Sequence, residues 1–300
     1  MVLEWFIPAI VLDVMVIVAN FAQQLIIFRK WSSIDRIDHL LLSLSISDLI
    51  SGLVMLLTDS YIMHEHLTGM MNQEQTAFSK IVDMCFDSVF VFSIFASIFH
   101  VISVAVERLW AIKFPRKYYI FTTFKMKCGT ISLIWCLSLT LTVLFSALNI
   151  LSTQEEIGTF IRGVVFAGSA ILVFVTYVYI AYLLLQQRRK NKQTFSNESQ
   201  DRRLRRLTIL CLFIGISFVA CILPITVGYL DADLYHHSSN LLITLNSLIN
   251  PFIYFVKVYY ESRSRRHSIT RTRSDTNNAL LDTRSSNTVT TDIHDERSEI

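Results

Sequence analysis

Charged residues are scarce in this chain: they make up 17% of its 300 residues, whereas hydrophobic residues make up 52%. A soluble domain normally carries about a quarter of its residues as charges. The apolar residues also lie in blocks of roughly 20 or more, long enough to cross a bilayer as helices. A large soluble α-helical protein would show polar helix faces, and these blocks mostly do not. The composition therefore predicts an integral membrane protein.

Cysteine is scarce as well, with five residues. Cys85 alone lies near the predicted outer surface, and no second cysteine is available there to pair with it. A structural extracellular disulfide is therefore not expected. No internal repeat is evident, which disfavours the alternative of a seven-span transporter built from duplicated halves. Nothing in the sequence supports an enzyme or a nucleic-acid partner.

Seven apolar blocks are separated by charged and turn-forming clusters. The blocks are Trp5–Phe28, His39–Met63, Phe78–Arg108, Cys128–Leu151, Thr159–Gln187, Arg205–Leu230 and Ser238–Lys257. They predict an all-α membrane fold, a seven-transmembrane helix bundle over residues 1–260 in contact with membrane lipid. A short membrane-surface helix from Val256 to about Arg266 should follow. Residues 261–300, rich in Ser, Thr, Arg and Asn, are predicted to form a disordered cytoplasmic tail.

The basic residues predict the orientation of the bundle. With the amino terminus outside the cell, every Lys and Arg except Lys80 and Arg162 is cytoplasmic, a strong positive-inside pattern. We therefore expect a multi-pass plasma-membrane protein with an extracellular amino terminus. The outer connections are acidic, and Asp59 and Glu65 are expected to lie in one of them.

Polar residues inside the spans need a reason, because a charge at the centre of a span costs roughly 2.5–3.5 kcal/mol on insertion scales. Asp48 lies in the middle of the second span, Asn20 in the first and Ser97 in the third. The seventh span contains Asn246-Ser247-Leu248-Ile249-Asn250-Pro251-Phe252-Ile253-Tyr254.

This pattern resembles the rhodopsin-like G-protein-coupled receptors. Asn-Ser-x-x-Asn-Pro-x-x-Tyr in the seventh span is highly specific for that family. The other landmarks of the resemblance are Asn20, Asp48, Glu107-Arg108-Leu109, Pro115, Trp135 and Cys221-x-x-Pro224. They touch six of the seven predicted spans, so the resemblance covers about Trp5–Tyr260.

The resemblance implies a sodium ion within the bundle that favours the resting state. Its ligands would be oxygens of Asp48, Ser97, Asn246 and Asn250. A hard cation suits oxygen ligands, and its charge would compensate the buried carboxylate.

The resemblance also implies a heterotrimeric G protein and an extracellular ligand as partners. Glu107 would hold Arg108 at rest, and its release would let Arg108 meet the G protein while Tyr254 swings inward. Prolines remove backbone hydrogen bonds and would place hinges in the last two spans. The residues implied in coupling are Glu107, Arg108, Pro224, Asn250, Pro251 and Tyr254.

The chain departs from the family pattern at several positions. Ile222 stands where the family has a tryptophan, and the fifth span lacks a proline. The family's fifth-span tyrosine is either Tyr177 or Tyr179. The sixth span begins Leu204-Arg205-Arg206, without an acid that would lock Arg108. These losses predict appreciable basal signalling.

Asp83 stands where the family has its third-span cysteine, which resembles the cluster of melanocortin, sphingolipid and cannabinoid receptors. Asp83 and Asp87 share one helix face and are similar to two melanocortin-receptor aspartates that bind calcium and basic peptide. The third acid of that site would fall near Thr58, one position from Asp59. The alternative for Asp83 and Asp87 is a solvated helix end.

The ligand class stays open between a peptide and a lipid. Phe90 replaces the aspartate of amine receptors, and Thr244 replaces the retinal-binding lysine of opsins, which disfavours both classes. The acidic outer residues favour a cationic peptide, whereas Phe90, Val91 and Ile94 favour a lipid or another small apolar ligand.

The predicted tail carries regulatory patterns. Arg265-Arg266-His267-Ser268 is the arrangement that basophilic kinases recognise, so we expect phosphorylation at Ser268. Phosphates on the hydroxyls that follow would add negative charge and recruit arrestin. The ending Ser298-Glu299-Ile300 fits the ligand pattern of PDZ domains.

Overall fold

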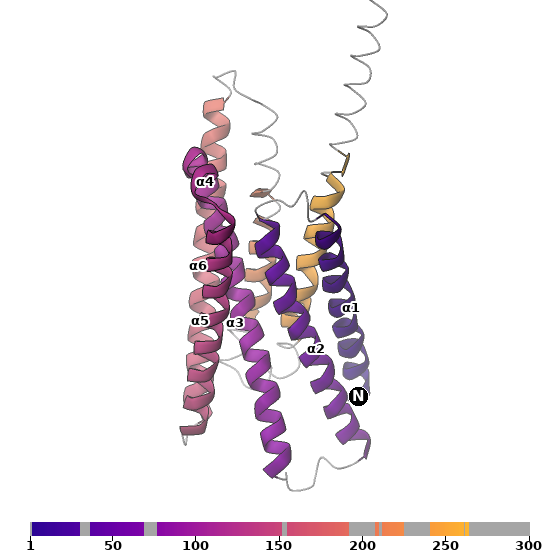
Figure 1. Cartoon of the computed structure of the whole chain (residues 1–300). Coiled ribbons are helices and arrows are strands. Elements are labelled where there is room, and N and C mark those ends of the chain that lie inside the picture. The colour runs from indigo at the N-terminus through magenta and orange to yellow at the C-terminus, as the bar shows by residue number, and fades with distance from the viewer. Residues whose placement is uncertain are drawn as a thin grey trace, which may run out of the picture. The chain divides into compact units, whose positions relative to one another are not determined.

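The computed structural model describes residues 2–30, 37–68, 77–151, 155–191, 208–209, 212–224, 241–260 and 262–263. Every regular element in these ranges is a helix (Figure 1). The chain divides into two compact units, residues 1–254 and residues 255–300. The sites described below lie in the first unit.

Long apolar helices dominate the described residues. They are α1 (Val2–Arg29), α2 (Asp38–Thr68), α3 (Ala77–Lys113), α5 (Phe124–Leu151), α6 (Glu155–Asn191) and the helix Leu241–Tyr260. These six are long and apolar enough to cross a membrane, and a shorter apolar helix covers Leu212–Pro224. The short α4 (Pro115–Phe121) follows α3. The prediction of an all-α membrane fold is confirmed.

The observed helices extend beyond the predicted apolar blocks. α3 continues past Arg108 to Lys113, and α6 begins at Glu155 rather than at Thr159. The prediction that Asp59 and Glu65 lie in an outer connection was wrong, because α2 continues to Thr68 and contains both residues, with Asp59 buried. Hydropathy marks only the apolar part of a span, whereas helical hydrogen bonding continues through polar residues.

α3 packs against more neighbours than any other labelled helix. α2 lies between α1 and α3, and α3 also packs against α5 and α6 (Figure 1). The ring of Phe95 in α3 is buried, 5.4 Å from the ring of Phe145 in α5 and 6.1 Å from that of Phe166 in α6. Aromatic contacts at these distances stabilise the three-helix junction.

α1 is held to α2 and to the helix Leu241–Tyr260 by buried amides. Gln23 Nε2 donates a hydrogen bond to the carbonyl oxygen of Leu41 at 3.2 Å. Asn20 Nδ2 donates to the carbonyl oxygen of Ser247 at 3.1 Å. The Asn20 landmark therefore joins two helices that are far apart in sequence.

α6 and the helix Leu212–Pro224 meet where Tyr177 faces Gly215. A Cβ atom added to Gly215 would overlap the ring of Tyr177. Tyr177 is 4% exposed, whereas Tyr179 is 39% exposed. Of the two tyrosines that the sequence left open, Tyr177 is the one that points into the bundle.

A buried hydrogen-bonded chain joins α2, α3 and α5. Trp135 Nε1 donates to Ser43 Oγ at 2.9 Å, and His100 Nε2 lies 2.7 Å from the same oxygen. His100 Nδ1 lies 2.6 Å from the carbonyl oxygen of Ala96. A carbonyl only accepts, so Nδ1 is the donor and Nε2 is left to accept from the Ser43 hydroxyl. This chain places the Trp135 landmark against the two other helices.

Candidate functional site

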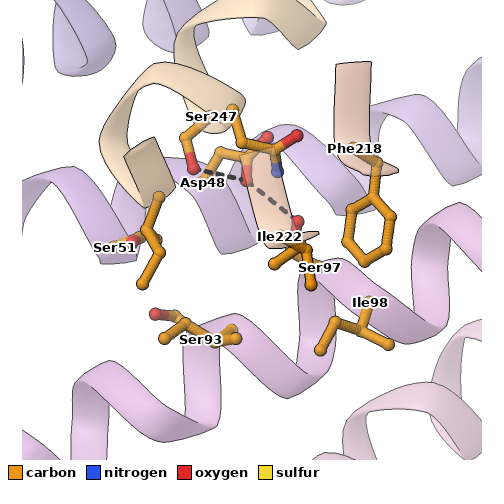
Figure 2. A pocket seen from close by; sticks show the side chains of 11 residues that line it. Asp48, Ser51, Ser93, Ser97, Ile98, Phe218, Ile222 and Ser247 are labelled. Carbon is orange, nitrogen blue, oxygen red and sulfur yellow. Dashed lines mark hydrogen bonds between the residues drawn. The ribbon is translucent and has the colours of Figure 1, made fainter. Parts of the chain in front are cut away.

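Asp48 lies at the centre of a buried polar site formed by α2, α3 and the helix Leu241–Tyr260 (Figure 2). Its Oδ1 accepts hydrogen bonds from Ser97 Oγ at 3.3 Å and from Ser247 Oγ at 3.1 Å. Its Oδ2 accepts from Asn250 Nδ2 at 2.8 Å. These donors compensate a carboxyl group that would be costly to bury alone.

A small cavity lies beside the Asp48 carboxyl group. Its volume is about 10 Å³, which is room for about one water-sized particle. Asp48, Ser97 and Asn246 line its polar side, and Phe218 and Ile222 from the helix Leu212–Pro224 line its apolar side (Figure 2). Ile222 therefore closes the cavity with a buried aliphatic side chain where the family pattern has an aromatic one.

The residues around this cavity fit a small hard cation. Asn246 lines the cavity, and Asn250 is hydrogen-bonded to Asp48 beside it. Oδ1 of Asn246 and Oδ1 of Asn250 are buried, and neither accepts a hydrogen bond within the described part of the chain. Carboxylate, hydroxyl and amide oxygens are the ligands that hard cations prefer. The structure thus brings together the four residues predicted to hold sodium: Asp48, Ser97, Asn246 and Asn250.

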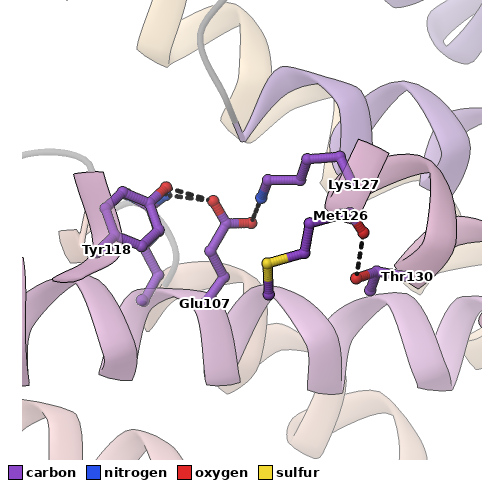
Figure 3. Close-up of polar contacts among 6 residues, drawn as sticks. Glu107, Tyr118, Met126, Lys127 and Thr130 are labelled. Carbon is purple, nitrogen blue, oxygen red and sulfur yellow. Dashed lines mark hydrogen bonds and ion pairs between the residues drawn. The ribbon is translucent and has the colours of Figure 1, made fainter. Parts of the chain in front are cut away.

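A second polar cluster surrounds Glu107 near the end of α3 that is predicted to face the cytoplasm (Figure 3). Glu107 Oε1 accepts from the Tyr118 hydroxyl at 2.5 Å and from Arg108 Nη2 at 3.3 Å. Glu107 Oε2 forms an ion pair with Lys127 Nζ. We refer to Glu107, Arg108, Tyr118 and Lys127 as the Glu107 cluster. Sequence reasoning found Glu107 and Arg108 and missed the other two.

Local sequence signals position the two missed residues. Pro115 opens α4, where its fixed φ and missing N–H are tolerated, and Tyr118 lies one turn further on. Thr123 Oγ1 accepts a hydrogen bond from the backbone N–H of Met126 at 3.3 Å, which caps the first turn of α5. Lys127 is the next residue, so the cap fixes where its side chain leaves the helix.

The family model of the seven-transmembrane receptors, rhodopsin family, matches residues 19–254. This range holds both sites described above and most of the chain. The chain belongs to this family. It is therefore a multi-pass membrane receptor of signal transduction, and it is not an enzyme. Membership confirms the resemblance to the rhodopsin-like family and implies an extracellular ligand and a G protein as partners.

The receptor also contains a buried carboxyl pair that sequence reasoning missed. The side chain of Asp13 in α1 interacts with those of Asp59 in α2 and Thr244 in the helix Leu241–Tyr260, and all three are buried. Asp13 is the one charged residue within the apolar block Trp5–Phe28, and that signal could have revealed it.

The three acids proposed for ligand or calcium binding are not brought together. Asp83 and Asp87 are exposed on α3, whereas Asp59 is buried against Asp13. The described part of the receptor holds no group of three or more His, Cys, Asp or Glu side chains arranged for a metal. Phe90 is half-buried one turn below Asp87. Calcium binding stays a prediction that rests on the Asp83 and Asp87 pair.

The structure describes some of the remaining residues that were predicted to act in coupling or regulation, and others lie outside the described ranges. Pro251 and Tyr254 are buried within the helix Leu241–Tyr260, which continues through the proline. Pro224 is the last described residue of its helix and is exposed. Ser268, the arrestin and PDZ patterns, and the start of the sixth predicted span lie outside the described residues.

Proposed function

We propose that this receptor transmits the binding of an extracellular ligand to a heterotrimeric G protein through Arg108. The observation that supports this proposal is the way Arg108 is held. It is buried, and one of its nitrogens, Nη2, lies 3.3 Å from Glu107 and 3.5 Å from Tyr118. A guanidinium in this arrangement can leave its partner and offer a planar set of donors to another protein.

To transmit a signal, the helix bundle must exist in two states. The extracellular ligand and the G protein both shift the equilibrium between these states. In the resting state Arg108 stays against Glu107. In the signalling state Arg108 leaves and contacts the G protein. A ligand that binds the second state more tightly raises its population, and by linkage the G protein raises the affinity for that ligand.

Receptor-stimulated nucleotide exchange tests this proposal directly. Membranes that contain the expressed receptor should accelerate GTPγS uptake by at least one class of G protein above membranes that lack it. Tracer flux across the same membranes should not change, which distinguishes the receptor from a seven-span transporter. A verified surface receptor that accelerates exchange by no class, alone or with any ligand of a screening library, would contradict the proposal.

We further propose that the Asp48 site holds sodium and that sodium favours the resting state. The support is the water-sized cavity beside Asp48 together with the free oxygen lone pairs of Asn246 and Asn250 within the described residues. A bound cation would neutralise the carboxylate and join α2, α3 and the helix Leu241–Tyr260. Movement of these helices apart would then cost the ion its ligands.

Replacing Asp48 with Asn should abolish stabilisation by sodium. At about ten times its Kd, sodium should stabilise the parent by roughly 1.4 kcal/mol, which shifts the midpoint of thermal unfolding by roughly 3–6 °C for a domain of this size. The measurement compares NaCl with choline chloride at equal ionic strength. Asp87→Asn, which removes an exposed carboxylate from α3, is the matched control and should keep the shift. A parent receptor with no difference between the two salts would rule out the ion site.

For the ligand, we propose a cationic peptide. Asp83 and Asp87 are exposed one turn apart on α3, so a cationic side chain can reach both carboxylates. A lipid is the second candidate, because Val91 and Ile94 are buried on the following turns and Ile94 lines the cavity beside Asp48.

Asp87→Asn should weaken a cationic peptide agonist by about tenfold, the loss expected from one charge-assisted hydrogen bond. The measurement is the half-maximal concentration for G-protein activation at matched surface expression. Glu65→Gln removes an acid near the end of α2 and controls for the loss of negative charge alone. An agonist whose potency changes neither with Asp87→Asn nor with calcium chelation would favour the lipid.

A further inference from the structure

Glu107 contacts more residues than Arg108, the one partner that the family resemblance implied for it. Its two carboxylate oxygens serve Tyr118, Arg108 and Lys127, which come from α4, α3 and α5 (Figure 3). Arg108 makes the longest of these contacts, at 3.3 Å, whereas the Tyr118 hydroxyl lies at 2.5 Å. Lys127 alone among them pairs with Oε2. Arg108 can therefore leave without removing either of the other two contacts.

The Glu107 cluster is buried, which makes its charges expensive to separate. Glu107 is 7% exposed, Arg108 3% and Lys127 6%. Removing one member of a buried ion pair is strongly destabilising when the other is left uncompensated. If Arg108 were the sole counter-ion of Glu107, its departure would leave a buried carboxylate unpaired. The position of Lys127 avoids that state.

From this geometry we infer that Lys127 is the counter-ion of Glu107 when Arg108 departs, and that it thereby sets how readily the receptor signals. Lys127 is a positioning residue: it acts on Arg108 through Glu107. The inference rests on the proposed coupling through Arg108 and deepens it. It also gives a physical cause for the predicted basal signalling, because Lys127 and Arg108 carry like charges near one carboxylate and their mutual repulsion favours the departure of Arg108.

Lys127 is suited to this role by its place in the fold. It lies in the first turn and a half of α5 after the Thr123 cap, so its backbone is fixed while its side chain crosses to α3. Lys125, two residues earlier, is exposed. The two lysines differ in direction and share a helix, so Lys125 provides a matched control for the loss of one positive charge from this end of α5.

The test measures ligand-independent GTPγS exchange per surface receptor in membranes with the G protein that the parent activates best. Lys127→Met keeps the unbranched side chain as far as Cε and removes the charged group, and it should lower exchange by at least about threefold. Lys127→Arg should retain most of the parent's exchange, and Lys125→Met should equal the parent. In a Glu107→Gln background, Lys127→Met should cause no further fall, because no carboxylate remains to neutralise.

These outcomes separate the inference from the proposed function. A parent that stimulates exchange while Lys127→Met exchanges equally well or better would overturn the role of Lys127 alone. A parent that stimulates no exchange, alone or with any ligand of the screening library, would contradict G-protein coupling instead. The ion pair is then tested by thermal unfolding of the purified parent, Glu107→Gln, Lys127→Met and the double variant. Non-additive midpoints support the pair, and additive midpoints overturn it.

Discussion

Arg108→Ala should abolish receptor-stimulated nucleotide exchange, with a loss of about a hundredfold or more. That loss corresponds to roughly 2.7 kcal/mol of lost transition-state stabilisation. Release of Arg108 leaves the contacts of Glu107 with Tyr118 and Lys127 in place. Alanine offers no donor that a G protein could use, whereas the guanidinium offers five in a planar fork.

The same geometry predicts that Arg108→Ala will still fold. Glu107 keeps its contacts with Tyr118 and Lys127, so the substitution leaves no unpaired carboxylate. Surface expression should therefore stay within a factor of about two of the parent, since no buried charge loses its last partner. Arg116→Ala, which removes an exposed arginine from α4, is the matched control and should signal normally. Agonist- or basally driven exchange that survives in a well-expressed Arg108→Ala receptor would show that coupling does not use this residue.

Gly215→Ala should markedly lower the thermal stability of the receptor. The added methyl group would overlap the ring of Tyr177, which is buried between α6 and the helix Leu212–Pro224. Overpacking of this kind costs about 1–3 kcal/mol, so the midpoint should fall by roughly 2–4 °C for each kcal/mol. Small residues let helices approach closely within a membrane, and this contact is such a place.

Gly168→Ala in α6 is the same chemical change, but we expect it not to lower the thermal stability of the receptor. A Cβ atom at Gly168 would meet nothing within 4 Å, and alanine is favoured over glycine within a helix by about 0.5–1 kcal/mol. Its midpoint should therefore equal or exceed that of the parent. Adding Tyr177→Leu to Gly215→Ala should recover part of the loss, because a smaller side chain leaves room for the methyl group. A Gly215→Ala receptor as stable as the parent would mean that the two helices can separate at no cost.

The fold was predictable because lipid imposes a strong and local constraint. Every backbone polar group within the bilayer must be satisfied inside its own helix, so long apolar blocks indicate spans without further information. The ends of the spans were less predictable. Asp59 was placed in a connection because it is charged, yet its carboxyl group has a partner in Asp13, which no local pattern could supply.

The candidate sites were predictable where one motif carries several of their residues. Asn246, Asn250 and Tyr254 belong to a single motif, and Asp48 matched a second one. Lys127 and Tyr118 belong to no motif, and their contact with Glu107 depends on how α4 and α5 return to α3. Tyr177 and Tyr179 were indistinguishable in the sequence because both lie in an apolar helix, and only packing against Gly215 separates them.

The chain formed by Trp135, Ser43 and His100 has a consequence for how this protein can change over generations. Ser43 accepts from the indole and is the donor available to the imidazole. Loss of its hydroxyl would therefore remove one partner from the half-buried Trp135 and one from the buried His100 at the same time. A substitution at any one of these positions alters what the other two require. Because the three positions depend on one another in this way, we expect them to vary together among related receptors rather than one at a time.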